Sequence, residues 1–275
     1  MPASPWSSPT ITLTGCPTGV VALYLNAGTV LDGARAAGPA GPISTPRVTI
    51  DVTAPTATAP KLALRSGVAL GGASTAQPLP ATLSWTGADI GSGLASFDVA
   101  RSYDGAAWTT IAGGSAATSL TTTLNPGHSY RFRVRARDKA GNIGAWAYAS
   151  TWYPSLVQQT SSTVVYTGIW ATNADTLASG GSIRHSGTAA STASLTFSGR
   201  AVALVTRLRS ISGAAQVYVD GVLVATVDTV AASTIERQIV FSKAWTSYAS
   251  HTIRIVVVGT ANRPQIDLDA FEVVH

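Results

Sequence analysis

Acidic side chains are the first candidates for chemistry, because hydrolysis of a glycosidic bond normally needs two carboxyl groups several ångströms apart. The 275 residues include 13 acidic ones, and only Glu236 and Glu272 among them are glutamates. Several aspartates stand in turn sequences, as Asp104 and Asp220 do before glycine, where the carboxylate bonds the local backbone. The G-x-S-x-G motif and phosphate-binding glycine motifs are absent. We therefore expect no catalytic residues and no enzymatic activity.

A metal site is suggested at one place only. Asp267 and Asp269 stand two residues apart in QIDLDAF, so a strand there places both side chains on one face. Two interpretations are open: a solvated or loop-bonded strand edge, or a structural calcium site, since carboxylate oxygens suit that ion. The four histidines show no metal-ligand spacing, and Cys16 is the only cysteine. Beyond this candidate calcium, we expect no metal and no cofactor.

Sugar binding requires less than catalysis does. An aromatic ring can stack on a sugar, and a few polar groups can hold its hydroxyls. In residues 154–275 the aromatic candidates are Trp170 and Tyr248, and the polar candidates are Arg184 and Arg207. An alternative is open for each: Trp170 can pack at the rim of a core, and the arginines can serve as solubilising charges.

The stretch YRFRVRAR, residues 130–137, shows which elements position these side chains. Apolar residues alternate with four arginines, which predicts a strand with one buried face and one face in water. A nucleic-acid surface would need aromatic rings among the arginines, and here the aromatic residues of the strand point the other way. Charged residues make up 11% of the chain, against about 25% in an average protein. Together with abundant β-branched residues, this composition predicts an all-β protein.

The segment around this strand carries a family resemblance. Leu124, then Pro126-Gly127, then Tyr130 form a turn into an aromatic strand start, and Trp85 lies in ATLSWTG. In this order the motifs resemble fibronectin type III domains, which implies a β-sandwich over residues 53–153. The resemblance also implies a tyrosine corner, in which the Tyr130 hydroxyl bonds nearby backbone.

The last segment carries a second resemblance. AQVYVDGVLVATV predicts a hairpin whose Asp220-Gly221 pair suits a type I′ turn. With YTGIW, SGGSIRHS, LTFSGRAVALV, HTIRIVVVG and IDLDAFEV, it resembles galactose-binding-like jelly-roll domains, which are similar to carbohydrate-binding modules. A jelly roll over residues 154–275 is implied.

The opening segment is too short for a sandwich, which usually takes about 100 residues. STPRVTIDVTAP resembles the junctions between tandem bacterial immunoglobulin-like repeats, so residues 1–52 are predicted to be a partial Ig-like module. The expected fold class is therefore all-β: tandem β-sandwiches, fibronectin type III-like and then jelly roll, preceded by this partial module.

Charge and targeting signals narrow the expected role. The net charge of +5 divides into +4 over residues 1–153 (10 basic, 6 acidic) and +1 over residues 154–275 (8 basic, 7 acidic). A near-neutral last segment favours neutral glycans over nucleic acid, whose binding depends on many phosphate contacts. The sequence contains no signal peptide pattern and no membrane-length apolar run.

We therefore expect a non-catalytic accessory region of a secreted or surface protein of bacterial type. One domain would be a spacer, and the other would bind polysaccharide or a cell-surface glycan beside a catalytic or surface domain. Nucleic acid and membrane insertion are not expected, and an extracellular or cell-surface location is inferred from the domain types. The alternative is a purely structural stalk or adhesion region without a ligand pocket.

Overall fold

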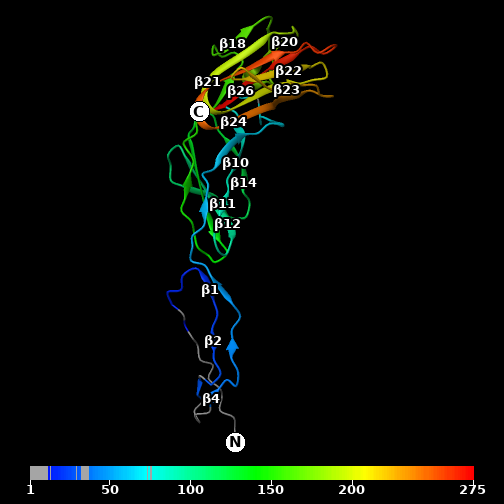
Figure 1. The fold of residues 1–275 in the computed structure, drawn as a ribbon. Helices are drawn as coiled ribbons and strands as arrows, with labels where there is room; N and C mark the ends of the chain where they lie inside the picture. Colours follow the sequence, from blue (N-terminus) through cyan, green and yellow to red (C-terminus); the bar gives the residue numbers. More distant parts are fainter. Residues whose placement is uncertain (1–11, 13, 29, 32–36, 73, 75) are drawn as a thin grey trace.

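The computed structural model describes residues 12–275 except positions 13, 29, 32–36, 73 and 75. The described chain consists of β-strands and their connections, with one short 3-10 turn, η1 (Ser179–Gly181), so the predicted all-β class is confirmed. Among these residues no helix is long and apolar enough to cross a membrane. The three predicted segments follow one another along the molecule (Figure 1).

The first segment is a long antiparallel hairpin. Its paired strands are nested: β1 (Gly19–Val21) with β6 (Val48–Ile50), β2 (Tyr24–Leu25) with β5 (Ile43–Ser44), and β3 (Val30–Leu31) with β4 (Ala37–Gly38). Val20 and Tyr24 are exposed, as expected for a ribbon without a second sheet. A two-stranded hairpin is marginally stable by itself in water. Residues 1–11 of the predicted partial module lie outside the described residues.

The second segment contains two antiparallel sheets that enclose a core. The first sheet has the order β14 (Ser119–Leu124), β10 (Leu79–Ser84), β8 (Lys61–Leu64). The second has the order β13 (Thr109–Ser115), β12 (Leu94–Tyr103), β15 (Tyr130–Asp138), β16 (Ala147–Tyr148). A short pair, β7 (Thr56–Ala57) with β11 (Gly87–Ala88), lies beside them. The core contains Trp85, which packs edge-on against Phe97 at 6.1 Å.

The predicted alternation in β15 is present. Tyr130, Phe132, Val134 and Ala136 are buried, and the arginines between them point to the opposite face. The Tyr130 hydroxyl, on a side chain 1% exposed, accepts a hydrogen bond of 2.7 Å from the backbone N–H of Asn125. The hydroxyl therefore makes the backbone bond that a tyrosine corner requires.

The third segment is built on two long strands that run through the whole sandwich. The main path is β17 (Pro154–Gln158), β26 (Ala270–Val274), β21 (Thr192–Leu208), β24 (Ile235–Val257), β22 (Ala214–Val219), β23 (Val222–Asp228). β18 (Val164–Thr167) pairs with β21, and a smaller sheet has the order β19 (Ala171–Ala174), β20 (Ser182–Ser186), β25 (Ile266–Leu268). Asp220 and Gly221 have φ values of +52° and +81°, which fit the predicted type I′ turn.

One sheet of the third segment buries both of its faces. Val202, Leu204, Phe271 and Val273 point into the sandwich core. Their neighbours in sequence, Ala201, Ala203, Val205, Ala270 and Val274, belong to the same apolar cluster as Leu64, Leu70, Trp85 and Phe132 of the second segment. β9 (Val68–Ala69) also pairs with Gln238 and Ile239 of β24. The second and third segments therefore share a core and a sheet edge.

Glu272 lies in this shared interface. Alternation along β26 places its side chain on the same face as Ala270 and Val274. The side chain is 0% exposed, and within the described part of the chain neither carboxyl oxygen has a hydrogen-bond partner. Burial raises the pKa of Glu272 to about 8, so the carboxyl group is protonated at neutral pH.

The protonation of Glu272 makes stability depend on pH. Between its ordinary pKa of 4.5 and the folded value of about 8, the unfolded chain releases the proton while the folded chain keeps it. Stability from this group is therefore lost as pH rises through that window. Glu272→Gln is expected to match the wild type below pH 4.5 and to exceed it by about 4 kcal/mol at pH 8. Urea denaturation at both pH values measures this difference, and an unchanged difference between the two proteins across the window would refute it.

The tyrosine bond generates a second prediction. Tyr130→Phe removes the hydroxyl acceptor and leaves the Asn125 N–H without its partner, which is expected to cost about 1–2 kcal/mol of unfolding free energy. Tyr103→Phe is the matched control, because the Tyr103 ring packs against Tyr130 at 5.2 Å. Chemical denaturation compares the two variants. An equal loss in both would show that the bond itself contributes little.

Candidate functional site

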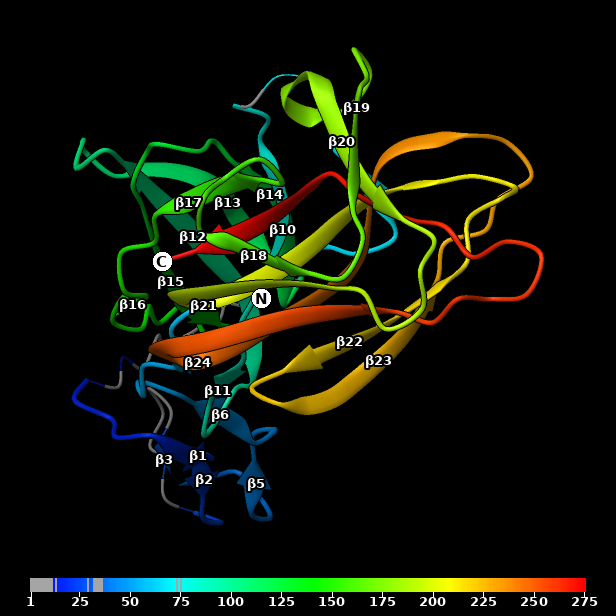
Figure 2. The same cartoon turned by 90° about the horizontal axis from the view of Figure 1, so that it is seen from above.

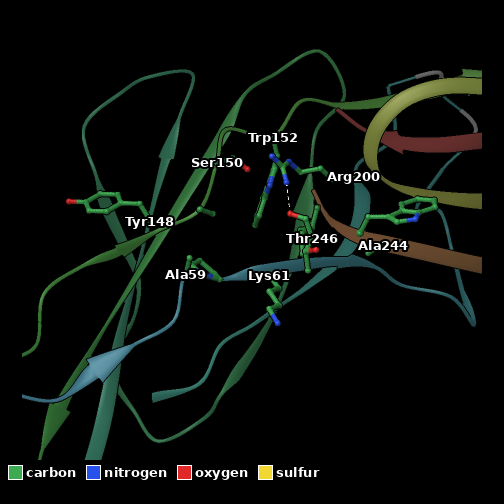
Figure 3. Close-up of a pocket in the computed structure, with 12 residues that line it drawn as sticks. Ala59, Lys61, Tyr148, Ser150, Trp152, Arg200, Ala244 and Thr246 are labelled. Carbon is green, nitrogen blue, oxygen red and sulfur yellow. Dashed lines mark hydrogen bonds between the residues drawn. The ribbon is translucent and has the colours of Figure 1, made fainter. Parts of the chain in front are cut away.

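A cleft of about 370 Å³ lies between the second and third segments (Figure 3). The second segment contributes the start of β8 and the chain after β16, and the third contributes the middle of β21 and β24. The lining residues are Ala59, Pro60, Lys61, Leu62, Tyr148, Ala149, Ser150, Trp152, Arg200, Ala244, Trp245 and Thr246. The walls are mainly apolar and aromatic, which is typical of sites for small organic ligands.

A bulge in β24 forms the third segment's wall. Gly199 pairs with Ala249 and Ala201 pairs with Ala244, so residues 245–248 of β24 leave the ladder. Gly199 is required here, because a Cβ atom at this position would lie 2.6 Å from the Val274 carbonyl oxygen. The Arg200 Nη1 group donates a hydrogen bond of 2.6 Å to the Thr246 carbonyl and so fastens the bulge (Figure 3).

The aromatic rings at the cleft are held by neighbouring side chains. Trp245 stacks on the His251 ring at 3.8 Å, and His251 Nδ1 lies 2.8 Å from the Asp220 carboxylate. Trp152, which is 3% exposed, packs against Phe132 at 5.3 Å. Trp245 lines the cleft and is only partly buried, although its ring also packs with Phe197 of the third segment's core, whereas Trp152 is mainly support.

The charged groups at the cleft are cationic. Lys61 and Arg200 line it from opposite segments, and the lining contains no acidic residue. Lys243 Nζ lies 5.4 Å from the centre of the Trp245 ring. An aromatic ring beside N–H donors can stack on a sugar and bond its oxygens, and cationic donors bond most strongly to negatively charged oxygens.

The four predicted sugar-binding residues do not form one site. Trp170 and Arg184 lie near each other, because the Trp170 ring meets Tyr166 edge-on at 5.2 Å and the Arg184 guanidinium lies 4.1 Å from the Tyr166 ring centre. Trp170 also packs against the apolar core, and its Nε1 donates to the Thr167 carbonyl at 3.1 Å. These contacts fit the rim-packing alternative for Trp170.

Arg207 and Tyr248 lie elsewhere. Arg207 is 9% exposed and forms ion pairs with Asp175 and Asp267, so the alternative interpretation of Arg207 as a solubilising charge is wrong. Tyr248 is 54% exposed and belongs to the β24 bulge beside the cleft.

Asp267 and Asp269 are buried, so the solvated form of the predicted strand edge is wrong, whereas the loop-bonded form fits Asp269, which accepts a backbone N–H from the η1 turn. The Asp267 carboxylate bonds Arg207 at 3.2 Å and Arg209 at 2.8 Å, and these guanidinium groups occupy oxygens that a calcium ion would need. Asp269 accepts the Ser179 N–H at 3.2 Å, and burial raises its pKa to about 7. The physical reason for the error is that β25 packs inside the fold, where the charge of Asp267 is neutralised by Arg207 of β21 and by Arg209 just after it.

A different acidic group could hold a metal ion. Asp51, Asp89 and Asp138 each offer an oxygen within 4.8 Å of the others, at the junction of the first two segments. Hydrogen bonds already join these loops: Ser92 N–H to Asp51 at 2.7 Å, Gly93 N–H to Asp89 at 2.7 Å, and the Asn142 side-chain amide to Asp138 at 2.7 Å. These bonds account for the clustering of the carboxylates.

Sequence reasoning missed the cleft because its residues are far apart in the chain. Lys61 and Trp245 belong to different predicted domains, and Trp152 stands in the segment interpreted as a boundary. The available signals were Trp245, three residues before Tyr248, and the glycine before Arg200. Neither signal indicates that a second segment completes the site.

The chain matches none of the known protein-family models. It is 34% identical over 167 residues to endoglucanase B of Cellulomonas fimi, covering 59% of this chain and 15% of that protein. It is 30% identical over 140 residues to the A type blood N-acetyl-alpha-D-galactosamine deacetylase of Flavonifractor plautii, covering 49% and 17% respectively. The chain thus spans about a sixth of the length of these two relatives, whose names denote carbohydrate-active enzymes.

Solved structures show weaker likeness. A family two carbohydrate esterase from Cellvibrio japonicus has a TM-score of 0.35 and 13% identity over 45% of this chain and 34% of that chain. A structure from a study of carbohydrate-binding modules of the β-sandwich superfamily has a TM-score of 0.26 and 12% identity over 82% and 93% respectively. At TM-scores this low, the likeness does not indicate a shared ligand.

Proposed function

We propose that this chain is a non-catalytic, glycan-binding accessory region of a secreted bacterial protein. A fibronectin type III-like domain and a galactose-binding-like jelly-roll domain together form the binding unit. The observation that carries the proposal is the cleft, which Trp245 and Arg200 of one segment line together with Lys61 of the other. Its partner is a polysaccharide or cell-surface glycan, and the location is extracellular or at the cell surface. The two carbohydrate-active relatives support the same substrate class.

The chemistry of the cleft suits a sugar. The apolar face of a sugar ring packs on an indole, while the ring hydroxyls accept hydrogen bonds from ammonium and guanidinium groups. The shared core holds both walls in fixed positions, so little ordering of the protein is needed on binding. A rigid, preformed site of this kind is typical of ligand pockets.

A structural stalk is the second candidate. Within the third segment the aromatic rings do not gather in one groove: Tyr166 and Trp170 form one group, Trp245 packs with Phe197, and Tyr218 pairs with Arg254. This scatter favours the stalk if that segment is considered alone. The glycan proposal therefore depends on Trp245, which lines the cleft between the second and third segments.

Trp245→Ala tests the proposed function. The substitution removes a stacking surface worth about 1.5–3 kcal/mol, so affinity is expected to fall about 10- to 100-fold. Gel retardation in a panel of soluble polysaccharides identifies a ligand, and titration calorimetry measures the change. Trp245→Phe retains a ring and is expected to lose less.

Tyr24→Ala is the matched control, because Tyr24 is an exposed aromatic residue of the first segment, distant from the cleft. Thermal unfolding checks that the variant without Trp245 remains folded. Absence of binding to every polysaccharide by the wild type would support the stalk instead.

The absence of catalysis is part of the proposal and is tested at one pair of residues. Ser155 Oγ lies 2.9 Å from His275 Nε2, the contact expected of a nucleophile and its base, but His275 Nδ1 lies 2.7 Å from the Ser198 carbonyl rather than from a carboxylate. We expect no hydrolysis of aryl acetates above the uncatalysed rate. Hydrolysis that disappears in Ser155→Ala would show an esterase and would contradict the proposal.

A further inference from the structure

A second set of aromatic and cationic side chains covers the outer face of the second segment. Four arginines, Arg131, Arg133, Arg135 and Arg137, project from one face of β15, and neighbouring chain segments place Trp108, Trp146 and Tyr148 beside them; these seven residues form the arginine–aromatic face. The Arg133 guanidinium lies 4.3 Å from the Trp108 ring centre and 4.2 Å from that of Trp146. Arg135 lies 4.5 Å from Trp146, and Arg131 lies 5.5 Å from Tyr148.

This face changes the interpretation of the alternating strand. Within β15 the aromatic residues do point away from the arginines, as predicted. The rings that accompany the arginines come instead from residues 108, 146 and 148, outside that strand. The face therefore combines charge with aromatic surface, which the sequence of one strand could not reveal.

Stacking on a ring leaves a guanidinium group free to bind an anion. The ring contacts the flat face of the guanidinium, whereas the N–H donors of the guanidinium lie in its plane. Arg133 Nε is buried and its Nη1 bonds Tyr148, so the exposed Arg131 and Arg137 offer the most open donors. Arg135 uses its donors on Asp98 at 2.9 Å. Within the described part of the chain, Arg131, Arg133 and Arg137 form no ion pair, so the face has uncompensated positive charge.

The arginine–aromatic face is continuous with the cleft. Tyr148 lines the cleft and is also the end of this face, because its ring packs edge-on against Trp108 at 5.6 Å and points away from the cleft (Figure 3). The Arg133 Nη1 group donates to the Tyr148 hydroxyl at 3.4 Å. From Arg131 to Arg137 the strand extends about 20 Å, which is longer than a single sugar ring.

We infer that the arginine–aromatic face and the cleft together bind one chain of an acidic polysaccharide, with the arginines of β15 pairing with its carboxylate or sulfate groups. This inference rests on the proposed function and names its ligand class, in place of the neutral glycan expected from the charge of the third segment alone. Nucleic acid fits less well, because bases need open ring faces and the faces of Trp108 and Trp146 are covered by guanidinium groups.

The test uses the full chain and polygalacturonate, with its fully methyl-esterified form as the uncharged probe of the same backbone. Titration at low and at physiological ionic strength is expected to show tighter binding of the acidic form, weakened by salt. The double variant Arg131→Gln/Arg137→Gln removes two exposed charges without touching the cleft lining. Its affinity for polygalacturonate is expected to fall about 3- to 20-fold and its salt dependence to decrease.

Arg254→Gln is the matched control, because Arg254 is also exposed and stacks on a ring, that of Tyr218 at 4.6 Å, but lies in the third segment. It is expected to bind as the wild type does. Thermal unfolding verifies that the variants remain folded.

Each outcome separates this inference from the proposed function. Equal binding of the two probes overturns the inference, as does a double variant that binds as the control does. If Trp245→Ala still weakens binding in that case, the proposed function stands. Tighter binding of single-stranded DNA, with the same sensitivity to Arg131 and Arg137, assigns the face to nucleic acid and also overturns it. Failure of every polysaccharide to bind overturns both.

Discussion

Burial of both faces of one sheet is the constraint on which the rest of the structure depends. β21 and β26 place one row of side chains in the core of their own sandwich and the alternate row against the second segment. Since apolar burial on each side contributes roughly 25 cal/mol per Å², neither segment can move away from the other without exposing apolar surface to water. The cleft and the position of Tyr148 relative to Trp245 follow from that fixed contact.

Much of the fold could be predicted because a strand records its own two faces in its sequence. The alternation in residues 130–137 and the type I′ turn at Asp220-Gly221 are local properties, and the structure contains both of them. The alternation of apolar and polar residues disappears in a strand whose sheet is buried on both faces. In AFEVV every residue is buried, and the glutamate inside it gave no sign of its surroundings.

The candidate site was less predictable because it depends on which strands become neighbours. Arg207 and Asp267 looked like surface or edge residues in the sequence, yet register brings them together as a buried ion pair. Breaking such a pair is costly, because one charge would remain buried without compensation. Trp108 and Arg133 similarly come together only because the segment before β13 packs beside β15. A single sequence shows which side chains of a strand share a face, but it does not show which strands lie beside it.

The pairing of β9 with β24 has a consequence for inheritance. Two residues of one segment complete the sheet edge of the next, and Leu70 just beyond them lies in the common core. A gene rearrangement that separated the two segments between Tyr153 and Pro154 would expose apolar core residues of both and would leave β9 and part of β24 unpaired. We therefore expect the second and third segments to be inherited together, as one unit.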